Sequence, residues 1–229
     1  MTMRLIAVYH KEPALRFISH LDVQRTLHRA LVRAAIPVRY SAGFNPHPLL
    51  SFATALSTGM AGDAEYFDVQ LCGPMLPAEF EQRLNAVLPQ GFFVSDAMAA
   101  KEGMGSLAAL LRAASYEAVL HMEVALSKSI VQAAVDSLLE DKIMVNKRTK
   151  KGLRPVDIRP QILKVSVERV EDTTIVLHVL GRLQADGGLR TELLLSALLD
   201  RLGVKAEKML CRRALYFDPD GPLPRLPQD

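Results

Sequence analysis

Hydrophobic residues recur along the chain at two spacings, and these spacings predict an alternation of helices and strands. In residues 19–35 they recur every three or four positions, which is typical of a helix with one buried face. These apolar residues are Val23, Leu27, Ala30, Leu31 and Ala34. Ser19 precedes the helix and Asp22 follows three residues later, as in a capping box, and Pro37 ends it. By contrast, residues 5–10 are apolar and partly β-branched, which predicts a strand.

The first hundred residues predict the element order β-α-β-β-α-β. After the first strand and helix, we expect strands at 49–56, 64–71 and 92–98 and a second helix at 77–88. This order matches the split βαβ, ferredoxin-like arrangement. We therefore predict a ferredoxin-like domain over residues 1–100, followed by a linker over residues 101–114 that ends in a short helix.

The second half of the chain repeats the same rhythm. We expect strands at 116–126, 142–145, 163–170, 174–180 and 208–217, and helices at 127–139 and 191–202. The pattern predicts a second ferredoxin-like domain over residues 115–218, with an inserted basic hairpin. Residues 219–229 are rich in proline, and we expect an extended, mobile tail there. The predicted fold class is α+β with two ferredoxin-like (split βαβ) domains.

Composition narrows the class of protein. The chain is 49% hydrophobic, which favours a packed globular fold, and no apolar run reaches the roughly 18 to 20 residues that cross a bilayer. A cytoplasmic protein is the expectation. The two cysteines, Cys72 and Cys211, lie far apart and cannot by themselves hold an iron–sulfur cluster or a four-cysteine zinc site. We therefore expect no cofactor in the isolated chain, and no metal.

Basic residues are concentrated in one block. The net charge is only +3, but residues 142–164 carry eight lysines and arginines against the single acid Asp157. Clustered cations of this kind can neutralise the phosphates of a nucleic acid. The candidate nucleic-acid-binding residues are Lys147, Arg148, Lys150, Lys151, Arg154 and Arg159. The alternative is a solvated hairpin tip that has no partner.

A second group of polar residues lies between residues 16 and 51. Arg25, Arg29 and Arg33 recur at four-residue spacing on one helix face, and guanidinium groups suit bidentate contacts with phosphate. Tyr40 and Phe44 can stack on unpaired bases. The candidate ligand-binding residues are Arg16, Arg25, Arg29, Tyr40, Ser41, Phe44, Asn45 and Ser51.

Three further residues are candidates for catalysis. His20, Asp22 and His47 have the side chains of a general acid and base or of metal ligands. We expect them to surround one pocket with Arg25 and Asn45. Against a catalytic role, the capping box already explains Asp22. The sequence also contains neither a nucleophile elbow nor a glycine-rich phosphate loop.

Several of these residues carry a resemblance to a known family. The segments are RFISHLD at 16–22 with Arg25, YSAGFNPHP at 40–48, SFA at 51–53, KKG at 150–152, DIR at 157–159 and GLR at 188–190. Together they resemble the radical-SAM-linked protein family, a domain of unknown function that is fused to radical SAM enzymes or stands as a separate protein. The resemblance implies a radical SAM enzyme as partner, with RNA as the shared substrate, and it supplies no reaction. Because the chain lacks cluster-binding cysteines, it corresponds to the stand-alone version.

The sequence thus leads to one functional hypothesis and two alternatives. The hypothesis is an RNA-binding accessory protein that partners a radical SAM, RNA-modifying enzyme and positions its substrate. The first alternative is a metal-dependent or acid–base enzyme that acts on RNA through His20, Asp22 and His47. The second is a protein–protein adaptor whose basic hairpin meets an acidic partner.

Overall fold

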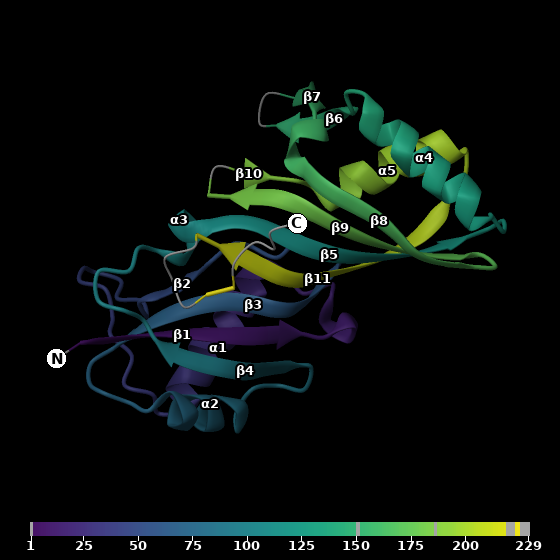
Figure 1. Cartoon of the computed structure of the whole chain (residues 1–229). Helices are drawn as coiled ribbons and strands as arrows, with labels where there is room; N and C mark the ends of the chain where they lie inside the picture. The colour runs from purple at the N-terminus through teal and green to yellow at the C-terminus, as the bar shows by residue number, and fades with distance from the viewer. Residues whose placement is uncertain (1, 150–151, 186, 219–222, 225–229) are drawn as a thin grey trace. The chain divides into compact units, whose positions relative to one another are not determined.

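The computed structural model of the chain describes residues 2–149, 152–185, 187–218 and 223–224 (Figure 1). The chain forms two compact units, which are Met1–Arg112 with Cys211–Asp229, and Ala113–Leu210. The second unit is therefore an insertion within the first. The predicted second domain, residues 115–218, differs from this division at its end, because the last strand of the chain contributes contacts to the first unit from Cys211 onward.

The first unit is built around an antiparallel sheet. Its elements are β1 (Met3–Lys11), a 3-10 turn (Pro13–Leu15), α1 (His20–Arg33), β2 (Leu50–Phe52), β3 (Met60–Leu71), α2 (Pro77–Asn85), β4 (Phe92–Ala99), α3 (Leu107–Leu110) and the end of β11 (Ala206–Phe217). The strand order is β11-β3-β1-β4, and β2 also pairs with β3. The pairs β1–β3, β1–β4 and β2–β3 are all antiparallel.

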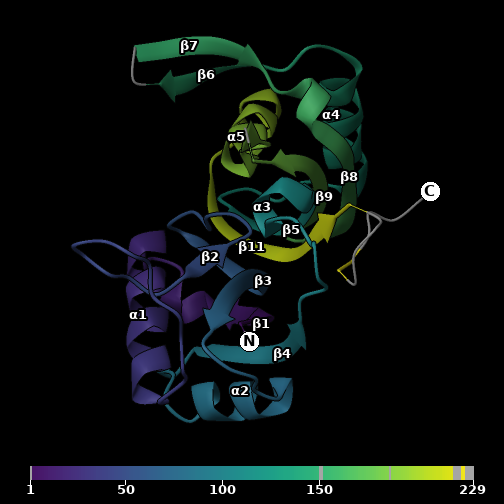
Figure 2. The same cartoon turned by 90° about the vertical axis from the view of Figure 1, so that its left-hand side faces the viewer.

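Helices α1 and α2 pack on the same side of this sheet (Figure 2). The apolar face that predicts α1 is the face that is buried, since Val23 and Leu27 are each 1% exposed. They share a core with Phe80 of α2 and with Leu5 and Tyr9 of β1. The predicted first helix is confirmed, including its cap at Ser19.

The second unit contains the predicted hairpin. Its elements are β5 (Leu111–Met122), α4 (Lys128–Glu140), β6 (Met144–Thr149), β7 (Gly152–Asp157), a 3-10 turn (Arg159–Gln161), β8 (Ile162–Glu171), β9 (Thr174–Gln184), β10 (Gly187–Gly188) and α5 (Thr191–Leu202). Strand β9 pairs antiparallel with β5, β8 and β10. Strands β6 and β7 form a sheet of their own, in which Lys147 is opposite Arg154.

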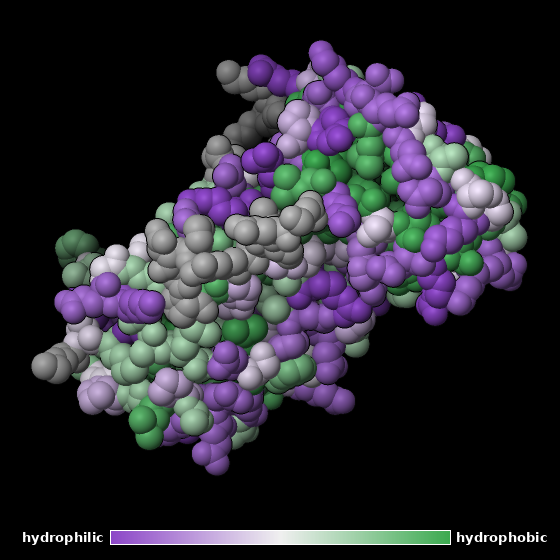
Figure 3. Space-filling model, viewed as in Figure 1, coloured by the Kyte–Doolittle hydropathy of each residue, from purple (hydrophilic) through white to green (hydrophobic). Residues whose placement is uncertain are grey.

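Helix α5 supplies much of the core of the second unit. Its leucines Leu194, Leu195 and Leu198 line a small apolar cavity of about 10 Å³ together with residues of α4, β8 and β9. Hydrophobic surface also shows over the region of β8 and α4 (Figure 3). Exposed hydrophobic residues of these two elements are Leu163 of β8, 39% exposed, and Ile130 of α4, 52% exposed.

Pairing is mostly antiparallel, and five helices lie within the described residues, so the chain has a mixed α and β fold. Two local predictions need correction. Strand β5 begins at Leu111, inside the predicted linker, because its first residues are buried in register with β9 from Ala113 onward. Within the predicted hairpin, the strand expected at 142–145 is β6 at Met144–Thr149, because its pairing with β7 continues to Thr149.

The end of the chain is described only in part. Of the predicted tail at 219–229, the structure describes Leu223 and Pro224; the rest lies outside the described residues. Leu223 is buried, and the Phe217 amide donates to the Pro224 carbonyl oxygen at 2.8 Å. In the described part of the chain, each helix is too short or too polar to cross a membrane.

Candidate functional site

The start of α1 holds an ordered carboxylate. The Ser19 hydroxyl donates to Asp22 Oδ2 at 2.7 Å, and Arg25 Nη1 donates to Asp22 Oδ1 at 3.0 Å. These two contacts, that of Ser19 first, lower the pKa of the Asp22 carboxyl from its ordinary value. Asp22 is therefore an ionised, exposed helix-capping group that is already paired with Arg25.

The outer face of α1 carries three exposed arginines. Arg25 is paired with Asp22, and Arg33 Nη2 donates to the Val87 carbonyl oxygen at 2.7 Å. Arg29 is exposed and makes no hydrogen bond or ion pair to any residue that the structure describes. The face therefore has guanidinium groups available for an anion.

Residues 39–49, which precede β2, form an ordered loop beside this face, called the 39–49 loop below. Tyr40 and Pro48 form a β-bridge, and Ser41 Oγ lies 2.9 Å from His47 Nδ1. The His47 amide also donates to Ser41 Oγ at 3.1 Å. At the tip of the loop, Phe44 is fully exposed. Ser41 and His47 thus close the loop and present an aromatic side chain to solvent.

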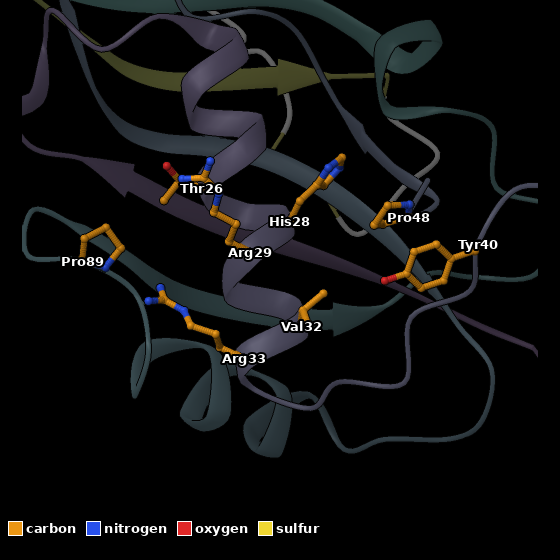
Figure 4. A pocket seen from close by; sticks show the side chains of 8 residues that line it. All are labelled: Thr26, His28, Arg29, Val32, Arg33, Tyr40, Pro48 and Pro89. Carbon is orange, nitrogen blue, oxygen red and sulfur yellow. The ribbon is translucent and has the colours of Figure 1, made fainter. Parts of the chain in front are cut away.

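A pocket opens between this loop and the outer face of α1 (Figure 4). Its volume is about 620 Å³, and all its lining residues belong to the first unit. They are Thr26, His28, Arg29, Val32, Arg33, Tyr40, Pro48 and Pro89. The pocket therefore combines arginine side chains with apolar and aromatic ones.

His28 is a pocket residue that the sequence did not single out. Burial, and secondarily the nearby His47, lowers the pKa of its imidazole from the ordinary value of 6.5. Its Nε2 atom is buried without a hydrogen-bond partner among the described residues. The neutral imidazole therefore retains an unmet capacity for one hydrogen bond at neutral pH.

His20 lies in a different environment. Its ring packs edge-on against Phe52 with 4.7 Å between the ring centroids, and its Nδ1 atom is buried without a partner in the described chain. Burial lowers the pKa of His20; the charge of Glu65 opposes this shift, and those of Arg212 and Lys11 add to it. His20 thus faces a buried cluster of charged residues, formed by Lys11, Glu65 and Arg212, beneath the start of α1.

The members of this cluster are bound to the protein itself. Lys11 is fully buried, and its Nζ donates to the carbonyl oxygens of Arg16 at 3.3 Å and Ile18 at 3.2 Å. Glu65 is paired with Arg212. These contacts hold the segment before α1 and the last strand onto the sheet.

His20, Asp22 and His47, the three candidates for catalysis, have separate partners in the structure. Among the described residues, no three His, Cys, Asp or Glu side chains are arranged to hold a metal ion. The physical reason is that His20 points to Phe52 and the buried cluster, Asp22 pairs with Arg25, and His47 closes its own loop on Ser41.

The remaining candidate residues are distributed over several places. Arg16 lies over the Phe17 ring at 4.5 Å, and Ser51 donates to Asp68 at 3.2 Å, away from the pocket residues. Asn45 is exposed in the 39–49 loop. In the second unit, the guanidinium of Arg159 donates to two backbone carbonyls, those of Leu139 at 2.6 Å and Ile162 at 3.1 Å.

The hairpin residues are described in part. Arg154 is exposed on β7. Lys150 and Lys151 lie outside the described residues, as do the side chains of Lys147 and Arg148. The basic hairpin therefore stays a prediction beyond its backbone pairing.

The spacing of residues along α1 could have identified part of the pocket from the sequence. His28 and Val32 follow Arg25 at three and seven residues, so they lie next to the row of arginines on the helix surface. Pro89 could not be found in this way, because it reaches the pocket from the segment after α2.

Fold and site together define a two-unit α/β protein that exposes arginine and aromatic side chains around a pocket. The chain belongs to the family described as "Uncharacterized protein conserved in bacteria (DUF2344)", which matches residues 4–190. That description names neither an activity nor an enzyme partner. No curated protein matches the chain in sequence.

Comparison with solved structures gives one match with a TM-score above 0.5 and two with lower scores. "Crystal Structure of a Cbf5-Nop10-Gar1 Complex" has a TM-score of 0.53 at 15% identity, over 94% of this chain and 50% of that one. The archaeal box H/ACA sRNP Nop10-Cbf5 complex has a TM-score of 0.49 at 13% identity, over 95% of this chain and 49% of that one. An H/ACA RNP bound to a substrate RNA containing 2'-deoxyuridine has a TM-score of 0.48 at 11% identity, over 94% and 49%. The chain spans about half the length of these chains, and the first of them shows a shared fold alone.

Proposed function

We propose that the chain binds RNA, and that the outer face of α1 with the 39–49 loop is its main contact surface. The observation that carries the proposal is the interleaving of exposed arginines with exposed aromatic side chains on this surface. Arg25 and Arg29 lie on the helix, while Tyr40, 46% exposed, and Phe44 lie on the loop. Guanidinium groups bind phosphates, and aromatic rings stack on unpaired bases, so the pair of side-chain types suits a single strand.

In the same proposal, the first unit is a ferredoxin-like, split βαβ domain. Three features support that assignment: the order β4-β1-β3 with antiparallel neighbours, the additional antiparallel pairing of β2 with β3, and two helices on one face. The fold by itself says nothing about RNA.

The β6–β7 hairpin is proposed as a second, separate phosphate-binding surface. Its support is the run of basic residues in the sequence and the exposed Arg154. Arg159 is left out of this surface, because two backbone carbonyls already engage its guanidinium.

The test is the affinity of the full chain for single-stranded RNA as a function of salt. Replacing Arg25 and Arg29 together by glutamine removes two positive charges from the proposed surface. We expect weaker binding and a salt slope lowered by up to about 0.7 for each lost phosphate contact. The matched control replaces Lys101 and Lys205, both exposed in connecting segments outside the proposed surface, by glutamine.

The control equals the test variant in net charge, so an effect of total charge appears in both. A loss of affinity confined to the Arg25/Arg29 variant supports the proposal. Equal affinities in the wild type and both variants, or no RNA binding by the wild type, would contradict it.

The radical SAM partner rests on the sequence resemblance, and we propose it as the finer form of this function, in the cytoplasm. The chain contains only two cysteines, Cys72 and Cys211, fewer than the three thiolates that usually hold a radical SAM cluster. The cleavage of S-adenosylmethionine would then belong to the partner. Co-purification of the chain with a radical SAM enzyme whose RNA affinity it changes tests this point. If no such enzyme is enriched, this finer form fails and RNA binding stands by itself.

A further inference from the structure

The pocket beside α1 has two chemically different halves (Figure 4). On one side of the helix lie Thr26, Arg29 and Arg33. On the other side His28 and Val32 point toward the loop residues Tyr40 and Pro48. A ligand that fills both halves needs an anionic group at one end and a flat or apolar group at the other.

The apolar half exposes surface that the protein does not cover. Val32 is 62% exposed and Tyr40 is 46% exposed, although both belong to ordered backbone. The backbone of Tyr40 is held by its bridge to Pro48, and Ser41 and His47 close the loop beyond it. A half-exposed aromatic ring on such a backbone suits stacking with a planar heterocycle.

The cationic half has a free guanidinium. Arg29 has no hydrogen-bond or ion-pair partner within the described chain, and the contact of Arg33 with the Val87 carbonyl uses one of its nitrogens. Arg33 is therefore held in place while it keeps further donors. Two arginines one helical turn apart can share one phosphate group.

His28 contributes an uncharged imidazole to the wall of the pocket. Because burial lowers the pKa of this imidazole from its ordinary value of 6.5, His28 is neutral at pH 7 and adds no positive charge. Its Nε2 atom is buried without a partner among the described residues, so it does not face the open space of the pocket. Binding of an anionic group therefore depends on the arginines.

We propose that this pocket holds one unpaired ribonucleotide, with its base against Tyr40 and Val32 and its phosphate on Arg29. This inference rests on the proposed function and names the form of RNA that the surface takes. The volume of about 620 Å³ lies within the range of small-ligand sites. A base inside a duplex has both faces stacked and cannot enter, so the pocket selects single-stranded or end nucleotides.

The test measures the binding of adenosine 5'-monophosphate and of ribose 5-phosphate to the full chain by calorimetry. The two probes share the phosphate and sugar, and only the first has a base. We expect wild-type protein to bind the mononucleotide more tightly by about five- to a hundredfold, the range that stacking on one aromatic side chain supplies. Tyr40→Ala should remove this preference, and Tyr40→Phe should retain it.

A second pair of variants separates the two halves. Arg29→Gln should weaken the binding of both probes by a similar factor, because both carry the phosphate. Phe93→Ala is the matched aromatic control, since Phe93 is a partly exposed phenylalanine of β4 and is not a lining residue of the pocket. It should leave mononucleotide binding unchanged.

Equal affinity of the two probes for the wild type would overturn the inference, as would a base preference that survives in a folded Tyr40→Ala variant. Single-stranded RNA is measured in parallel. If RNA binding depends on Arg25 and Arg29 while the mononucleotide does not bind, the pocket inference fails and the proposed function stands. If neither RNA nor mononucleotide binds, both fail.

Discussion

Arg212 of β11 and Glu65 of β3 form a buried, two-point ion pair. Arg212 Nε donates to Glu65 Oε1 at 2.7 Å, and Arg212 Nη2 donates to Glu65 Oε2 at 2.5 Å. The side chains are 4% and 1% exposed. The pair fastens the last strand of the chain to the sheet of the first unit, and Gly62 leaves the space that the Glu65 side chain occupies.

Breaking this pair from one side should be strongly destabilising. Arg212→Ala leaves the Glu65 carboxylate buried without its counter-charge, and we expect the free energy of unfolding to fall by about 3–5 kcal/mol. Urea denaturation of the full chain measures the change. The neighbouring Arg213 pairs with Asp63 at the surface, so Arg213→Ala should change stability by only about 1 kcal/mol or less. Similar losses in the two variants would contradict a special role for the buried pair.

The serine caps make a second prediction. Ser19 Oγ accepts from the Asp22 amide at the start of α1, and Ser127 Oγ accepts from the Ile130 amide at the start of α4. Replacing either serine by alanine should lower the free energy of unfolding by about 1 kcal/mol. Ser19→Gly is the comparison, because glycine is tolerated at this position and should lose only a few tenths of that value. A Ser19→Ala variant as stable as the wild type would show that the cap does not stabilise α1.

Lowering the pH should reduce the free energy of unfolding, because protonation of His20 favours the unfolded chain. Its pKa in the folded protein is lowered, mainly by burial, so the unfolded chain takes up a proton first as the pH falls below about 6.5. The stability contributed by neutral His20 is therefore present above pH 6.5 and is lost as the pH falls toward its folded-state pKa. Urea titrations at pH 7.0 and 5.5 should show a smaller loss for His20→Phe than for the wild type. An identical loss would mean that His20 does not contribute.

The basic hairpin predicts a change in salt dependence. Neutralising Lys147, Arg148, Lys150 and Lys151 together should reduce affinity for structured RNA. It should also lower the salt slope by about 0.7 to 0.9 for each phosphate contact that is lost. Filter binding at several salt concentrations measures the slope. An unchanged slope in a folded quadruple variant would remove the hairpin from the proposed function.

Local signals in the sequence predicted the elements whose causes are local. Helix α5 was expected at 191–202 and is found at Thr191–Leu202, because its leucine spacing and the glycine after it are both properties of neighbouring residues. The start of α1 at Ser19 has the same kind of cause. Prediction was weaker for β7, whose hydrogen bonds depend on a partner strand.

In the candidate site, too, the sequence predicted features with local causes better than features that depend on distant residues. Arg29 and Tyr40 were candidate ligand-binding residues, the first from its helical spacing and the second from its aromatic side chain, and both line the pocket. The direction of the His20 side chain could not be predicted, because it depends on Phe52 and on the buried charges of β1, β3 and β11. Nothing near His20 in the sequence reports that environment.

The insertion of the second unit within the first has a consequence for synthesis on the ribosome. Glu65 and Arg212 are separated by 147 positions, so the carboxylate emerges long before its counter-charge. A nascent first unit that closed early would bury Glu65 unpaired, at a cost of several kcal/mol. The second unit ends at Leu210, so it can fold before the last strand of the first unit has been synthesised. We therefore expect the first unit to complete its folding last during translation. A chain truncated before Arg212 should bind chaperones even though it contains all residues of the second unit.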